Sequence, residues 1–277
     1  MPQPFQSLYI ELLKKSLIDY SKINSYEYHP LKTINANWKT TLLYPLDKLL
    51  RKRNFAICKL QYVSEENRLY GYDWPANADT MIGMNRLNNI EHCIYSVINE
   101  NIEGDFIETG VWRGGATILM RGILKELKIT DRKVWVADSF TGLPKPDVSN
   151  FKADKGNKLH TIKILRVSSG EVKNNFKKYG LLDEQVIFLE GWFKDTLPKA
   201  PIKKLALLRL DGDLYESTIQ ALQILYPKLS VGGYVIIDDF NAFANCRHAV
   251  IDYRKDNNIF ENIIEIDREA VYWRRAK

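Results

Sequence analysis

The feature that most constrains the fold is an alternation, beginning after Gly104, of short apolar runs with longer segments of helical periodicity. The apolar runs cover residues 105–111, 134–139, 186–190, 205–210 and 234–237. The segments with apolar residues spaced as on a helix cover 116–128, 169–179, 217–229 and 246–256. Strands that are apolar throughout are buried on both faces, as in a parallel sheet with helices on each side. The sequence therefore predicts an α/β fold with a doubly wound, mostly parallel sheet.

The two ends of the chain depart from this alternation. Residues 262–266 and 271–273 flank a polar turn, which predicts a hairpin that closes the sheet with an antiparallel strand. Near the other end, residues 7–20 and 79–100 have helical spacing. Residues 21–75 are polar and aromatic with scattered prolines, which is typical of irregular structure with one short helix.

Composition excludes several classes of protein. The net charge is +6, but the basic residues lie in short groups far apart, so we expect solvated surface, or attraction for an anionic substrate, and no nucleic-acid partner. The three cysteines are widely spaced without a CxxC pair, which indicates a reducing compartment and neither a disulfide framework nor a zinc knuckle. Neither a signal peptide nor an apolar stretch of about 20 residues is present, so we expect a cytoplasmic protein without a membrane partner.

The first predicted strand runs into a glycine-containing segment, residues 108–115 with the sequence ETGVWRGG, and then into a helix. Glycine lets the backbone approach a ligand closely, and a helix N-terminus favours a carboxylate or phosphate. The spacing is not the GxGxxG of dinucleotide folds, which disfavours NAD. A plain strand-to-helix turn is the alternative interpretation.

The second and third predicted strands end at residues suited to a nucleoside. Asp138 ends the second strand, where an acidic side chain accepts hydrogen bonds from the two hydroxyls of a ribose. Gly191 and Trp192 follow the third strand, where an aromatic ring would pack against adenine. Alternatively, Asp138 caps a turn and Trp192 belongs to the core.

Four carboxylates follow the fourth and fifth predicted strands: Asp211, Asp213, Asp238 and Asp239. Like charges at neighbouring strand ends repel one another unless a cation lies between them. Oxygen ligands without cysteine favour a hard ion, which is Mg²⁺ or else Mn²⁺ or Ca²⁺. The alternative is that some of these carboxylates cap the next helices or pair with Arg247 and Lys194.

Taken together, several segments resemble the TylF (macrocin) O-methyltransferase family. They are DTMIGMNRLNNIEHCI, GDFIETGVWRGGATILMRG, VWVADSFTGLPKPD, FLEGWFKDTLPKAPI, LALLRLDGDLYEST and GGYVIIDDF, with LYIELLKKSLIDY and VYWRR near the two ends. The resemblance covers nearly the whole chain and is weakest over residues 21–70. It implies a seven-stranded, Rossmann-like class I methyltransferase fold over residues 101–277. It also implies an N-terminal helical lid within residues 1–100 and a homodimer.

The resemblance also implies roles for individual residues. Asp211, Asp238 and Asp239 would bind Mg²⁺, and Asp213 would be the general base. The residues expected to bind S-adenosylmethionine are Thr80, Met81, Glu108, Thr109, Gly110, Arg113, Gly114, Gly115, Asp138, Ser139, Gly191 and Trp192. The loop over residues 141–162 would border the substrate.

The sequence thus leads to one main hypothesis and two others. The main hypothesis is an O-methyltransferase that uses S-adenosylmethionine and Mg²⁺ to methylate a hydroxyl of a sugar or small-molecule metabolite in natural product biosynthesis. A catalytically silent nucleoside-binding partner protein on the same fold is the alternative, and the four aspartates count against it. A nicotinamide oxidoreductase is disfavoured by the missing GxGxxG.

Overall fold

A seven-stranded sheet lies at the centre of the computed structural model, which describes residues 7–34 and 37–277. Its strand order is β5-β4-β3-β6-β7-β9-β8, in which β3 to β7 run parallel and β9 pairs antiparallel with β7 and β8. The strands are β3 (Asp105–Thr109), β4 (Val134–Asp138), β5 (Val186–Glu190), β6 (Leu205–Leu210), β7 (Leu229–Ile237), β8 (Ile264–Glu265) and β9 (Val271–Arg274). This sheet confirms the predicted fold class, including the closing hairpin.

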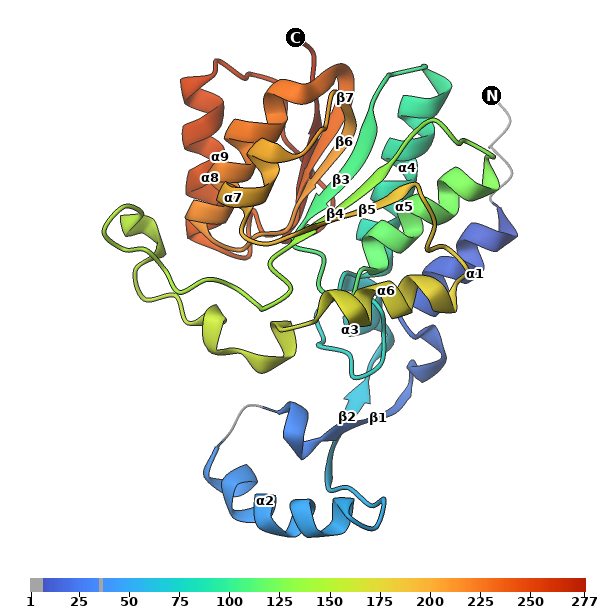
Figure 1. Ribbon diagram of the computed structural model, residues 1–277, viewed down its shortest axis with the longest axis vertical. Coiled ribbons are helices and arrows are strands. Elements are labelled where there is room, and N and C mark those ends of the chain that lie inside the picture. Colours follow the sequence, from blue (N-terminus) through green and yellow to red (C-terminus); the bar gives the residue numbers. More distant parts are fainter. Residues whose placement is uncertain (1–6, 35–36) are drawn as a thin grey trace.

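Helices cover both faces of the sheet (Figure 1). One face carries α1 (Leu8–Leu17), α4 (Met84–Asn99), α5 (Gly115–Glu126) and α6 (Ser169–Lys178). The other face carries α7 (Phe193–Thr196), α8 (Tyr215–Leu225) and α9 (Ala244–Asp256). Successive side chains of β3 point to opposite faces of the sheet, since Phe106 packs with the first group of helices and Ile107 with the second. Within the described residues, no helix is long and apolar enough to cross a membrane.

Short 3₁₀ helices lie in the loops. They are η1 (Tyr20–Lys22), η2 (Leu31–Thr33), η3 (Lys152–Asp154), η4 (Leu159–Thr161), η5 (Lys163–Leu165), η6 (Leu197–Lys199) and η7 (Tyr226–Lys228). Three of them, η3 to η5, lie in the long connection between β4 and α6, which runs out beside the sheet (Figure 1).

The prediction of irregular structure over residues 21–75 is wrong. Strands β1 (Ser25–Pro30) and β2 (Cys58–Val63) form an antiparallel ribbon that projects from the body of the protein. The helix α2 (Trp38–Arg51) lies at its far end, and α3 (Glu65–Tyr70) leads back to the body (Figure 1). The polar residues Glu27 and His29 lie on the buried face of β1, so its alternation is the reverse of the usual one.

The predicted helix over residues 79–100 also begins later than expected, at Met84. Asp79 instead links two other elements, because its N–H donates to the carbonyl of Leu17 (2.9 Å) and its carbonyl accepts from Gly115 (2.9 Å). This leaves Thr80 and Met81 in a segment without regular secondary structure, where they line a cavity.

Candidate active site

A cavity of about 550 Å³ opens at the carboxyl ends of the parallel strands, where a doubly wound sheet places its ligand. Its volume falls within the range of about 300–1,000 Å³ that is typical of small-molecule sites. Most of the residues predicted as the site lie together in its wall: Thr80, Met81, Glu108, Gly110, Asp138, Ser139, Gly191, Trp192, Asp211, Asp213, Asp238 and Asp239.

Gly110, in the glycine segment, occupies a position where a side chain does not fit. Gly110 has φ +83°, and a Cβ there would lie 1.7 Å from the carbonyl oxygen of Asp211. The loops that follow β3 and β6 therefore contact each other through backbone atoms. This contact holds the glycine segment beside the aspartates.

Four predicted site residues do not line this cavity: Thr109, Arg113, Gly114 and Gly115. Thr109 accepts a hydrogen bond from the N–H of Asp211 through its carbonyl (2.9 Å), and Gly114 caps α5 with φ +89°. The guanidinium of Arg113 stacks on Trp112 and donates to the carbonyl of Ala78 (2.7 Å). These residues support the loop from outside the cavity.

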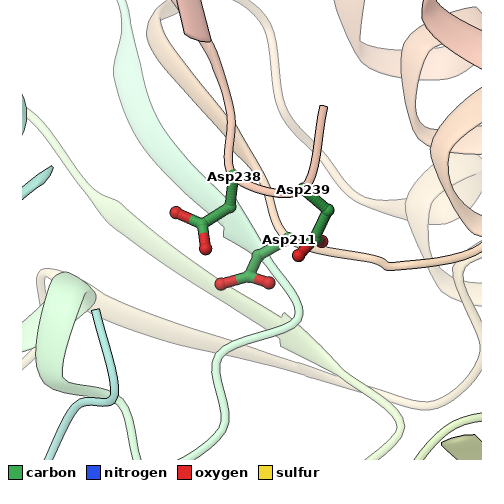
Figure 2. Close-up of side chains that lie close together, drawn as sticks. All are labelled: Asp211, Asp238 and Asp239. Atoms are coloured by element: carbon green, nitrogen blue, oxygen red, sulfur yellow. The ribbon is translucent and has the colours of Figure 1, made fainter. Parts of the chain in front are cut away.

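Three carboxylates converge in the wall. Asp211 follows β6, and Asp238 and Asp239 follow β7 (Figure 2). One carboxylate oxygen of each residue lies within 4.8 Å of one from each of the others. All three ligand atoms are oxygens, the type that Mg²⁺ prefers, so these residues fit a hard divalent cation.

Two buried arginines also balance this charge, and neither was predicted from the sequence. Arg209 pairs with Glu108, with Asp211 (2.9 Å) and with one oxygen of Asp238. Arg86 of α4 pairs with the other oxygen of Asp238 (2.7 Å). Each oxygen of Asp238 is therefore fixed by an arginine.

The two partners considered from the sequence behave differently. Arg247 donates to the carbonyl of Phe240 and to the side chain of Asn241 and forms no ion pair with the aspartates in the described part of the chain. Lys194 lines the cavity.

The sequence does contain a sign of the role of Arg209. It is the one charged residue in the run LALLRL, and a buried charge requires partners.

Burial and mutual repulsion shift the acidic groups unequally. Burial and the charge of Asp238 raise the pKa of Asp211 to about 6, and burial with Asp211 raises the pKa of Asp213 to about 8. Burial also raises the pKa of Glu108 to about 8. Burial would raise the pKa of Asp238 too, but Arg209 and Arg86 outweigh it and hold this pKa below its usual range. Full ionisation of the cluster would therefore leave more negative charge than its two arginines balance, and either protons or a cation would have to relieve it.

Asp213 differs from the other three aspartates in its surroundings. It has φ +59°, and its N–H donates to Asp239 (3.1 Å). Within residues 7–34 and 37–277, no hydrogen-bond donor reaches its carboxylate. This carboxylate faces the cavity with free acceptor atoms, as a group that takes up a proton must.

Two further carboxylates lie where a cofactor would extend from the glycine segment. Asp138 accepts hydrogen bonds from the N–H groups of Val111 (2.8 Å) and Phe140 (2.7 Å), which fixes its side chain. Glu108 has one oxygen paired with Arg209, and its second oxygen is buried without a partner in the described residues. An unpaired buried oxygen is costly unless a ligand supplies a donor.

Aromatic residues line another part of the cavity, and most of them were not anticipated. They are Tyr72, Trp74, Trp112, Trp192, Phe193 and Phe243. The loop over residues 141–162 borders the same cavity through Gly142, Leu143, Pro144, Lys145, Asp147 and Leu159, as expected. Aromatic faces beside polar groups suit a ligand with both apolar and hydroxyl-bearing parts.

Comparison with known proteins identifies the family. The profile of the macrocin O-methyltransferase (TylF) family matches residues 6–275. The chain belongs to this family. A demethyldecarbamoylnovobiocin O-methyltransferase from Streptomyces niveus is 56% identical over 214 residues, which are 77% of this chain and 82% of that protein.

A second relative and a solved structure agree with this assignment. The 8-demethyl-8-(2,3-dimethoxy-α-L-rhamnosyl)-tetracenomycin-C 4′-O-methyltransferase from Streptomyces olivaceus is 52% identical over 210 residues, 76% of this chain and 80% of that protein. The structure of the O-methyltransferase NovP is 47% identical, with a TM-score of 0.82 over 98% of this chain and 99% of NovP. This macrocin family member is therefore an O-methyltransferase with a class I methyltransferase fold.

Proposed function

We propose that this protein binds S-adenosylmethionine and Mg²⁺ in the large cavity and transfers the methyl group to a hydroxyl of a sugar or small-molecule metabolite. The observation that carries the proposal is the convergence of Asp211, Asp238 and Asp239 beside the free carboxylate of Asp213. The sugar-bearing acceptor is suggested by the rhamnosyl group in the name of one relative.

The cofactor would extend from the glycine segment across the strand ends. Glu108, with its unpaired oxygen, would accept from the ammonium of the methionine part, beside Gly110. Asp138 and Ser139 would hold the ribose hydroxyls, and Gly191 and Trp192 would flank the adenine. Thr80 and Met81 would cover the cofactor. Thr109, Arg113, Gly114 and Gly115 would act by shaping the loop.

The four aspartates would have two different roles, cation binding and proton acceptance. Asp211, Asp238 and Asp239 would hold the cation, which, when bound, favours loss of the hydroxyl proton by attracting the negative charge that develops on the acceptor. Asp213 would accept that proton. When bound, S-adenosylmethionine would supply the methyl group, whose carbon would gain a bond to the acceptor oxygen and lose its bond to sulfur, which would keep the electron pair as a neutral thioether. The protein would contribute the relative position of the two reactants and the charged groups around them, since the sulfonium of S-adenosylmethionine is already reactive.

The N-terminal part, residues 1–100, would serve as a lid over this chemistry and provide dimer contacts. Gly71, Tyr72 and Trp74 of this part already line the cavity, together with Thr80 and Met81. Arg86 joins the same part to Asp238. A movement of this part would therefore alter the cofactor cover and the metal ligands together.

A thermal-shift experiment tests the proposed ligands. S-adenosylhomocysteine and Mg²⁺ are each expected to raise the melting temperature, because a ligand that binds only the folded state stabilises it. NAD serves as the control and is expected to leave the melting temperature unchanged, since the chain has no GxGxxG. A shift with NAD and none with S-adenosylhomocysteine would contradict the proposal and favour an oxidoreductase.

Replacing Asp138 by Ala is expected to weaken S-adenosylhomocysteine binding by about 1.5–3 kcal/mol, the range for hydrogen bonds to a charged group. Asp105→Ala is the matched control. Asp105 also accepts hydrogen bonds, from the backbone N–H of Lys133 (2.9 Å) and from the indole N–H of Trp135 (2.8 Å). It begins β3, whereas Asp138 ends the parallel strand β4, so Asp105 lies at the other edge of the sheet from the cavity. Both variants should lose some stability, and only Asp138→Ala should lose affinity by calorimetry. Equal affinity for both variants would remove Asp138 from the ribose site.

A further inference from the structure

Arg113 leads to a second cavity. Although it belongs to the glycine segment, its side chain lines a separate cavity of about 390 Å³ between the β1–β2 ribbon and the residues around 163–171. The wall of this cavity consists of Tyr28, His29, Pro30, Lys32, Thr33, Ala76, Asn77, Arg113, Lys163, Ile164, Arg166, Val167 and Glu171.

The charges around the second cavity are strongly unbalanced. Four of its lining residues are basic and one is acidic: Lys32, Arg113, Lys163 and Arg166 against Glu171. His29 adds no charge at neutral pH, because burial, together with nearby Lys59 and Arg113, lowers its pKa. Several cations around one concave surface attract an anion that carries several negative oxygens.

Arg113 is the least exposed of these cations, and the acidic residues that act on its charge, Glu171, Asp79 and Glu27, do so without forming a salt bridge. Its guanidinium stacks on the ring of Trp112 at 4.2 Å and donates to the carbonyls of Ala78 (2.7 Å) and Pro75 (3.4 Å). In residues 7–34 and 37–277, no carboxylate forms a salt bridge with it. A half-buried arginine whose hydrogen bonds go to carbonyls and use only one of its three nitrogens keeps donors available for an anion.

The two cavities are lined by neighbouring residues of the same two segments. Trp112 lines the large cavity and Arg113 the second one, and Leu165 and Ile164 are divided in the same way. The indole N–H of Trp112 donates to the carbonyl of Ile164 (2.8 Å), which joins the two segments. The second cavity is therefore a distinct site next to the proposed cofactor site.

We propose that the second cavity binds a phosphoryl group, either as a free inorganic anion or as the diphosphate of a nucleotide. Arg113 provides a half-buried donor, and the exposed Lys32, Lys163 and Arg166 provide positive charge. The amide of Asn77 adds a neutral donor to the wall. The proposal concerns a site outside the methyl-transfer chemistry and does not depend on it.

Calorimetry with inorganic pyrophosphate tests the site, using the full chain in metal-free buffer saturated with S-adenosylhomocysteine. Saturable binding with one site per chain is expected. Lys32→Glu should weaken it at least tenfold, the effect of losing one charge-assisted contact. Lys199→Glu is the matched control, because Lys199 is also exposed, carries the same charge and lies outside both cavities. It should bind pyrophosphate like the wild-type protein.

Two further titrations identify the source of the phosphoryl group. Uridine diphosphate binding ten times more tightly than pyrophosphate would indicate a nucleotide, and equal or weaker binding would indicate the free anion. The proposal would be overturned if neither pyrophosphate nor uridine diphosphate bound saturably. It would also be overturned if Lys32→Glu and Lys199→Glu weakened pyrophosphate binding equally. A protein that binds pyrophosphate but not S-adenosylhomocysteine would support this site and contradict only the proposed cofactor.

Discussion

Asp213→Asn is expected to lower turnover by about 10²–10⁴, the usual contribution of a positioned general base. The amide has nearly the size of the carboxylate but cannot accept a proton at neutral pH. Asp211, Asp238 and Asp239 remain in place, so Mg²⁺ and S-adenosylhomocysteine should bind with unchanged affinity. Turnover at saturating Mg²⁺ and direct calorimetry of both ligands measure the two effects separately.

Asp238→Asn is the matched comparison, because it makes the same chemical change in a proposed metal ligand. It should weaken Mg²⁺ binding, and excess Mg²⁺ should partly restore turnover. The loss in Asp213→Asn should instead shrink as pH rises, since hydroxide or buffer then removes the proton of the acceptor hydroxyl. If Mg²⁺ rescued Asp213→Asn and not Asp238→Asn, the two roles would be reversed.

The sheet and the helices that pack on it could be predicted because burial determines their pattern. Strands such as β6 are buried along their whole length, so they appear in the sequence as continuous apolar runs. The hairpin of β8 and β9 was recognisable from the polar turn between two short apolar runs. In these regions local pattern and tertiary packing favour the same structure.

The N-terminal ribbon could not be predicted because its pattern is inverted. Tyr26 and Tyr28 of β1 are 55% and 62% exposed, whereas Glu27 is buried and held by Arg68 at 2.8 Å. Helix α2 has apolar residues such as Leu42 that are exposed to solvent, so no buried stripe marks it against the body. A rule that places apolar side chains inside has no means of finding either element.

The lining of the candidate site could be predicted where it depends on strand ends and less so where it depends on contacts between distant segments. The aspartates after β6 and β7 meet because parallel strands end at the same edge of a sheet. Arg86 reaches Asp238 from α4, 152 residues away in the sequence, and no local spacing indicates such a pair. Arg113 shows the opposite problem, since a residue within the glycine segment can lie outside the large cavity that this segment lines.

Removal of divalent cations is expected to abolish turnover, and Mg²⁺ is expected to restore it. Asp211, Asp238 and Asp239 place three carboxylates within 4.8 Å, and the arginines near them also pair with Glu108 and other acids. Without a cation, the remaining negative charge is relieved by protons, and protonated carboxylates neither hold the acceptor nor stabilise its developing charge. The effect should therefore exceed that of any single substitution in the cluster.

The measurement is turnover of enzyme freed of metal, in excess EDTA, followed by titration with Mg²⁺, Mn²⁺ and Ca²⁺. Calorimetry of S-adenosylhomocysteine in EDTA is the control and should give an affinity within a few-fold of that with Mg²⁺, because the proposed ribose contact, Asp138, is not one of the proposed metal ligands. Full turnover in EDTA would mean that Arg209 and Arg86 alone neutralise the cluster. Asp213 would then remove the proton without a metal, and the three convergent aspartates would be structural ion-pair partners of the arginines.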